Sequence, residues 1–222
     1  MDTIRHVCSL GQLCQASNMI KNNKLKLESY PFDWIFTSPD IIIHCLNDNF
    51  KTFLNRSLYV PHSNEPNMRK CGHSAYRNEM FNHHNPKDYD VDYNYFERCV
   101  KRFQQLLYSN NNKLFIVTFL FNHDLSTFEK NRKDVIEMNN TLKQYTTNFN
   151  IFVMFNILSS ETEHTLITYE NIDFCILYTK GKSDGVQFLD SEDNLYINNV
   201  LKNKYVFDVK PISMCIDNKN IC

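Results

Sequence analysis

Residues 113–121, KLFIVTFLF, decide the fold class of this chain. The stretch is an almost unbroken apolar run rather than an alternation of apolar and polar residues, which is typical of a strand buried on both faces. The same pattern returns at 151–157 (IFVMFNI) and at 173–179 (DFCILYT). Helical periodicity fills the intervals between such strands, so we predict an α/β fold with a mostly parallel sheet covered by helices on both faces.

Helices are expected where apolar residues recur at helical spacing. Ser38-Pro39-Asp40 combines a hydroxyl cap, a proline at the first helical position and an acid near the helix start. The predicted helices after this cap cover residues 38–54, 92–107, 125–145 and 192–203, and a last strand is predicted at 205–209. Ser126 and Glu129 match the capping-box spacing at the start of the third of these helices.

Cys14 is the candidate nucleophile of the N-terminal part. A short β-prone run at 6–10 breaks at Gly11, and a helix is expected from 12 to 22. Cys14 then lies in the first turn, where free N–H groups and the helix dipole favour a thiolate and lower the thiol pKa. The alternative is a small buried residue on the inner face of an amphipathic helix.

Two motifs carry a resemblance to a known family. SLGQLC at 9–14 and YPFDW at 30–34, followed more loosely by His83-His84, a helix at 95–107 and the next strand, resemble a family described as papain-like cysteine peptidases. The resemblance covers about the first half of the chain. It implies a nucleophile at Cys14 and a histidine partner at His84 or His83. It also implies, as an alternative fold, the papain-like α+β architecture of a helical lobe beside an antiparallel barrel.

Histidines and acids supply the other candidate site residues. Residues 55–94 lose periodicity and are rich in histidine, which predicts a long irregular loop of the kind that carries function. His84 or His83 in this loop is the candidate general base, unless both are exposed loop residues. His123 is a second candidate base because it follows the strand at 113–121, at the edge where α/β sheets bind ligands. We expect Asp33 or Asp124 to orient the imidazole.

The sequence supports no metal or cofactor. Cys71 and His73 followed by His83-His84 match no standard zinc spacing, and the chain contains no CxxC motif. It also lacks a glycine-rich phosphate loop. The eight cysteines are scattered singly, which indicates reduced thiols rather than a disulfide framework.

Length and composition restrict the remaining classes. We expect 222 residues to form a single domain, 1–222. A net charge of −1 argues against nucleic acid as the principal partner. No apolar run approaches the ~20 residues of a membrane span, and the start does not match a signal peptide, so we expect a cytoplasmic protein. The abundance of Asn, Lys, Ile, Tyr and Phe indicates an AT-rich genome.

The leading functional hypothesis is a peptidase-like cysteine hydrolase, or a related acyl transferase, acting on a protein or peptide-like substrate. A serine nucleophile at Ser9 is less favoured because Ser9 precedes the glycine instead of opening the helix. The alternatives are a non-catalytic protein-interaction module on the same scaffold and a transferase acting on a sugar or nucleotide at the sheet edge. A Cys14 sulfur within about 4 Å of a histidine nitrogen, in a cleft, would favour the enzyme.

Overall fold

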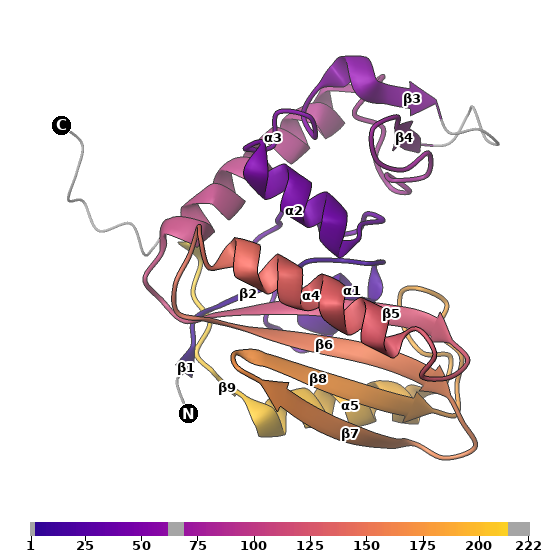
Figure 1. Cartoon of the computed structure of the whole chain (residues 1–222). Coiled ribbons are helices and arrows are strands. Elements are labelled where there is room, and N and C mark those ends of the chain that lie inside the picture. Colours follow the sequence, from indigo (N-terminus) through magenta and orange to yellow (C-terminus); the bar gives the residue numbers. More distant parts are fainter. Residues whose placement is uncertain (1–2, 62–68, 213–222) are drawn as a thin grey trace.

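The computed structural model describes residues 3–61 and 69–212 and contains a five-stranded sheet covered by helices (Figure 1). The strand order is β2-β5-β6-β8-β7, and every neighbouring pair is parallel except β7 with β8. The strands of this sheet are β2 (His6–Ser9), β5 (Lys113–Asn122), β6 (Phe149–Leu158), β7 (Glu163–Tyr169) and β8 (Ile172–Thr179). The predicted α/β fold with a mostly parallel sheet is therefore confirmed, and the antiparallel barrel of the papain-like alternative is not found among these strands.

The two faces of the sheet hold separate hydrophobic clusters. Along β5, Phe115 and Val117 belong to one cluster while Leu114 and Ile116 belong to the other, as the twofold alternation of a strand requires. The first face is covered by α2 (Pro39–Asn47), α3 (Asp90–Tyr108) and α4 (Phe128–Leu142), and the second by α1 (Gln15–Asn22) and α5 (Ser191–Lys204).

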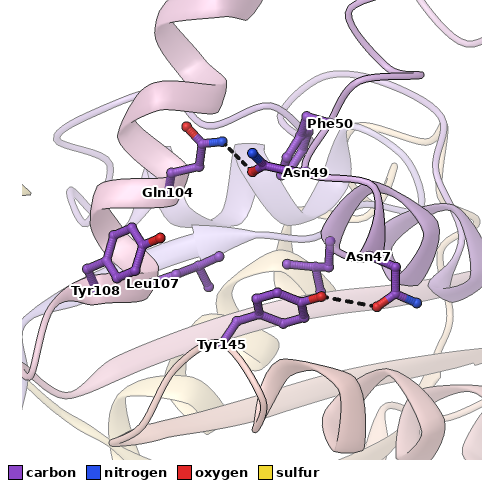
Figure 2. A pocket seen from close by; sticks show the side chains of 8 residues that line it. Asn47, Asn49, Phe50, Gln104, Leu107, Tyr108 and Tyr145 are labelled. Carbon is purple, nitrogen blue, oxygen red and sulfur yellow. Dashed lines mark hydrogen bonds between the residues drawn. The ribbon is translucent and has the colours of Figure 1, made fainter.

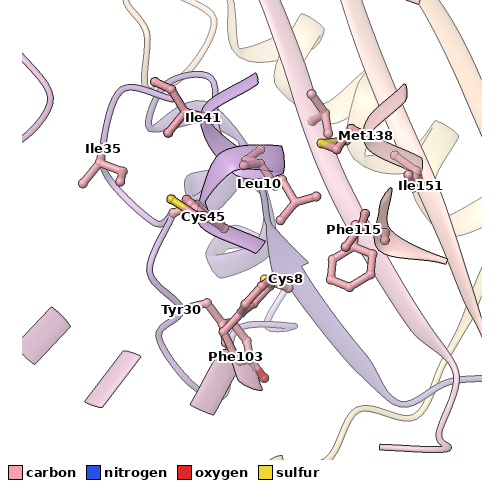
Figure 3. Close-up of a cluster of buried hydrophobic side chains, with 14 of the residues drawn as sticks. Cys8, Leu10, Tyr30, Ile35, Ile41, Cys45, Phe103, Phe115, Met138 and Ile151 are labelled. Carbon is pink, nitrogen blue, oxygen red and sulfur yellow. The ribbon is translucent and has the colours of Figure 1, made fainter. Parts of the chain in front are cut away.

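Aromatic rings and sulfur-bearing side chains fill the core of the first face. Phe103 of α3, Phe115 of β5 and Met138 of α4 are all completely buried there (Figure 3). Phe103 packs edge-on against Tyr30, whose ring is also buried. The segment after α1 is thus held against the sheet by the same cluster that holds α3 and α4.

Two short strand pairs lie outside the main sheet. β1 (Thr3–Ile4) pairs in parallel with β9 (Val206–Phe207), so the predicted last strand is shorter than expected. The predicted irregular region 55–94 contains a 3-10 turn (η1, Arg56–Leu58) and an antiparallel pair, β3 (Tyr59–Pro61) with β4 (Cys71–His73). Residues 62–68 of that region lie outside the described residues.

Three predicted helix boundaries were wrong. α2 ends at Asn47 rather than near residue 54, because Asn49 and Phe50 both adopt positive φ angles and cannot continue a helix. α4 begins at Phe128 without a side-chain cap, so the expected capping box does not form. α1 begins at Gln15, which leaves Cys14 at its N-cap. No helix among the described residues is long and apolar enough to cross a membrane.

Candidate functional site

A glycine turn places Cys14 at the carboxyl end of β2. Gly11 has φ +85°, and a Cβ atom there would lie 1.9 Å from Thr37 Oγ1, so the turn needs glycine. Thr37 in turn donates a hydrogen bond to the carbonyl of Leu10 at 2.9 Å. Cys14 follows as the N-cap of α1, and its side chain is only 4% exposed.

His83 is the histidine that contacts Cys14. The distance from Cys14 Sγ to His83 Nε2 is 3.5 Å, although 69 residues separate the two in sequence. His83 lies two residues after Phe81, and a β-bridge between Phe81 and Cys71 fixes the chain at that point. Because Cys14 is buried and His83 is exposed, the imidazole lies on the solvent side of the thiol. The separation is within the looser hydrogen-bond range expected of an unliganded catalytic pair.

The two groups of this pair are both uncharged near neutral pH. Burial, with a further contribution from the Asp184 carboxylate, raises the pKa of Cys14 to about 11. Burial also lowers the pKa of His83, and the neighbouring His84 and Lys70 lower it further. The expected lowering of the thiol pKa by the helix start is therefore wrong for this state, because desolvation of the thiolate outweighs the helix dipole.

His84 has a different set of partners. Its ring stacks on Tyr95 with centroids 4.6 Å apart, and its Nδ1 lies 3.2 Å from Asp92 Oδ1. Burial opposes ionisation of Asp92, but hydrogen bonds from Asn85, His84 and Arg69 hold the pKa of its carboxyl below the usual value. Asp92 lies in the first turn of α3, where it ties the His83-His84 segment to the helix.

Asp33 is completely buried and fixes the segment after α1. Its carboxylate accepts hydrogen bonds from Ser17 Oγ at 2.7 Å and from the Tyr30 backbone N–H at 2.8 Å, and it forms an ion pair with Lys26. These bonds join α1 to the turn of the YPFDW motif, and none of them reaches His83. In the described residues, no carboxylate hydrogen-bonds His83.

His123 and Asp124 lie at the carboxyl end of β5, as predicted from the sequence. Both are exposed, and Asp124 Oδ1 accepts a hydrogen bond from the Ser126 backbone N–H at 2.7 Å. They share this edge of the sheet with Cys14, because β5 is the parallel neighbour of β2. Among the described residues, no hydrogen bond or ion pair joins either of them to Cys14 or His83.

The loop after β8, residues 181–188, is the part of the site that sequence reasoning missed. Ser183 Oγ donates a hydrogen bond of 2.5 Å to Gln15 Oε1, and the Asn18 side chain donates to the Val186 carbonyl at 3.1 Å. These bonds hold the loop, with Asp184, against the helix that begins after Cys14. The sequence feature that could have predicted this loop is its position directly after the strand at 173–179, because ligand sites usually lie at the carboxyl ends of parallel strands.

Two buried amide atoms near Cys14 have no partner in the described part of the chain. They are Gln15 Nε2 and Gln12 Oε1. Gln15 is 1% exposed, and its other side-chain atom is held by Ser183. An unpaired buried donor costs free energy, so Gln15 Nε2 is a group available to a bound oxygen. No group of three or more metal-ligating side chains occurs among residues 3–61 and 69–212.

The fold and the site together define an α/β protein with a cysteine–histidine pair at the carboxyl edge of its sheet. Residues 5–159 match the family described as "Putative papain-like cysteine peptidase (DUF1796)", and the chain belongs to this family. The matched region contains both Cys14 and His83 and ends just after β6, so β7, β8 and α5 lie beyond it. No curated protein and no solved structure matches the chain.

Proposed function

We propose that this protein is a thiol-dependent hydrolase of the peptidase class, with Cys14 as the nucleophile and His83 as the general base and acid. The observation that carries the proposal is the 3.5 Å separation of Cys14 Sγ and His83 Nε2. The family match adds support for the peptidase class.

The charge states of the pair suggest how the reaction begins. Cys14 starts as a thiol and His83 as a neutral imidazole, so His83 accepts the thiol proton while the sulfur attacks the substrate carbonyl carbon. The backbone N–H groups at the start of α1 and the Gln15 Nε2 group are the donors proposed for the developing oxyanion.

The same two residues carry out the remaining steps of the proposed reaction. Collapse of the tetrahedral adduct breaks the scissile bond, and the leaving amine takes the proton from His83, which leaves a thioester on Cys14. Water then attacks the thioester and gives a proton to His83, which passes it to the departing sulfur. If an amine or alcohol attacks instead of water, the outcome is acyl transfer.

The residues around the pair have positioning or substrate-contact roles in this proposal. His84 and Asp92 hold the segment that carries His83, and Asp33 holds α1 and therefore Cys14. His123 and Asp124 lie at the same sheet edge and are proposed to contact substrate rather than Cys14. The hydrogen bonds of the described residues therefore favour a dyad over a triad.

The pair of neighbouring histidines gives a matched test. The parent protein and the variants Cys14→Ser, His83→Asn and His84→Asn are treated with p-nitrophenyl acetate, and the acetyl group is located by mass spectrometry. We expect acetylation of Cys14 in the parent. The rate should fall by at least ~100-fold in His83→Asn, because the general base is lost, and only a few-fold in His84→Asn.

A non-catalytic interaction module is the second candidate, and the 4% exposure of Cys14 is the observation that favours it. The same experiment separates the two functions. If the folded parent neither releases p-nitrophenol nor carries an acetyl group on Cys14, or if His83→Asn reacts as fast as the parent, the catalytic proposal is refuted and the module is favoured.

A further inference from the structure

A pocket lies on the first face of the sheet, and neither Cys14 nor His83 is among the residues that line it. It opens between the ends of α2 and α3 and the segment that follows α4, and its volume is about 260 Å³ (Figure 2). Its apolar floor is formed by Leu46, Phe50 and Leu107, all of them buried. This volume is below the ~300–1,000 Å³ typical of pockets for drug-sized ligands, so the pocket fits a single small ring.

The rim of the pocket is made of neutral hydrogen-bonding groups. Gln104 Nε2 donates to Asn49 Oδ1 at 2.8 Å, and the Tyr145 hydroxyl donates to Asn47 Oδ1 at 3.2 Å (Figure 2). These bonds fix the orientation of the asparagine amides. The Nδ2 groups of Asn47 and Asn49 and the Oε1 atom of Gln104 hydrogen-bond no other described residue, so donors and an acceptor remain for a ligand.

The backbone is strained at the wall of this pocket. Asn49 and Phe50 have φ angles of 54° and 60°, a left-handed conformation that is unusual for a bulky residue such as phenylalanine. The turn places the Phe50 ring in the core, where its centroid is 5.8 Å from that of Phe103, and leaves Asn49 exposed on the rim. Strain of this kind clusters at ligand sites.

The groups that line the pocket indicate the chemical class of ligand that it can bind. No charged side chain lines the pocket, so it has no partner for a phosphate, a carboxylate or an ammonium group. Two tyrosines, Tyr108 (85% exposed) and Tyr145 (37% exposed), offer aromatic surface beside the amides. Flat aromatic faces and paired amide groups suit a ring that has an apolar C–H face and hydroxyl groups at its edge.

We propose that this pocket binds one uncharged sugar unit of a glycan, independently of the thiol site. The amides of Asn47, Asn49 and Gln104 would hydrogen-bond the hydroxyl groups, and Tyr108 would pack on the C–H face of the ring.

Saturation-transfer NMR with the full chain tests the proposal. The probes are the methyl glycosides of glucose, galactose, mannose and N-acetylglucosamine at millimolar concentration, with an acetylated Asn-Gln-Asn amide as the peptide alternative. We expect saturation of at least one glycoside. Binding should weaken at least tenfold in Tyr108→Ala and in Gln104→Leu, but should stay unchanged in Tyr169→Ala, which removes an exposed tyrosine of β7, and in Cys14→Ser.

Tyr108 is the last residue of α3 and is almost fully exposed, so its substitution leaves the core intact, which circular dichroism can verify. The proposal is overturned if no glycoside is saturated, if only the peptide is, or if folded Tyr108→Ala and Gln104→Leu bind as well as the parent. Loss of acetylation at Cys14 without loss of sugar binding would affect only the proposed hydrolase.

Discussion

The reactivity of Cys14 toward iodoacetamide should be slow near neutral pH and should rise steeply at alkaline pH. With a pKa of about 11, the thiolate fraction at pH 7.5 is roughly 3 × 10⁻⁴, against about 0.1 for an unperturbed cysteine. Because the thiolate is the reacting species, native Cys14 should be alkylated on the order of 300-fold more slowly than Cys14 in the unfolded chain. The rate should climb about tenfold per pH unit until the pH approaches this pKa.

Asp184→Asn tests the electrostatic part of this shift. The Asp184 carboxylate opposes formation of a second negative charge on Cys14, so its removal should lower the thiol pKa and increase the rate at pH 7.5 about two- to tenfold. Asparagine keeps the side-chain oxygen that accepts hydrogen bonds from the Val186 and Gln187 N–H groups, both at 2.8 Å. Asp134→Asn, on α4, is the matched control and should leave the rate unchanged.

Pulse labelling across pH, followed by digestion and mass spectrometry, gives a rate for the peptide that contains Cys14. Cys175, which is completely buried in β8, serves as an internal monitor, since its labelling would signal unfolding rather than titration. An apparent Cys14 pKa below ~8.5 in the folded protein would refute the reasoning, because the thiolate would then be stabilised despite its burial. An unchanged rate in Asp184→Asn would show that the field of Asp184 does not reach the sulfur.

Two further substitutions test the scaffold that positions Cys14. Asp33→Ala should lower the free energy of unfolding in urea by about 3–5 kcal/mol, because it leaves the Lys26 ammonium without its buried partner. The Cys14 pKa of the folded fraction should not move, and a change in the free energy of unfolding below about 1 kcal/mol would contradict this structural role. Gly11→Ala should destabilise the protein more than Gly185→Ala. Both positions have positive φ, so alanine costs about 1–2 kcal/mol of backbone strain at each, but only at Gly11 would the new Cβ clash, 1.9 Å from Thr37 Oγ1. Equal stabilities of the two variants would rule out the clash.

The strands of the central sheet were predictable because burial on both faces leaves an uninterrupted apolar run. β5, β6 and β8 have this property, and each was located within a few residues. β7 was missed because it is an edge strand of largely exposed residues, whose pairing with β8 is decided by the neighbour rather than by its own composition. The end of α2 was missed because positive φ at Asn49 and Phe50 gives no compositional signal.

The candidate site was predictable only in its residue types. The glycine turn and the helix start identified Cys14, and the family resemblance limited its partner to two adjacent histidines. The choice between His83 and His84 depends on Asp92 and Tyr95, which engage His84 through tertiary contacts that sequence spacing does not encode. The contribution of Asp184 was equally inaccessible, because it comes from a loop 170 residues away in sequence.

The charge state of Cys14 results from two opposing effects whose sizes decide the outcome. A favourable helix terminus contributes typically ~0.3–1 kcal/mol to a nearby charge, whereas raising the thiol pKa from its ordinary value of about 8.5 to about 11 corresponds to roughly 3 kcal/mol. Desolvation therefore prevails, and in the proposed hydrolase the thiol proton would leave during attack rather than before it, so that the mechanism depends on the adjacent neutral imidazole of His83. Cys14 and His83 lie inside the family-matched residues 5–159, but Asp184 lies beyond them. The segment outside the match thus tunes the thiol of the pair inside it, and Asp184→Asn isolates that contribution.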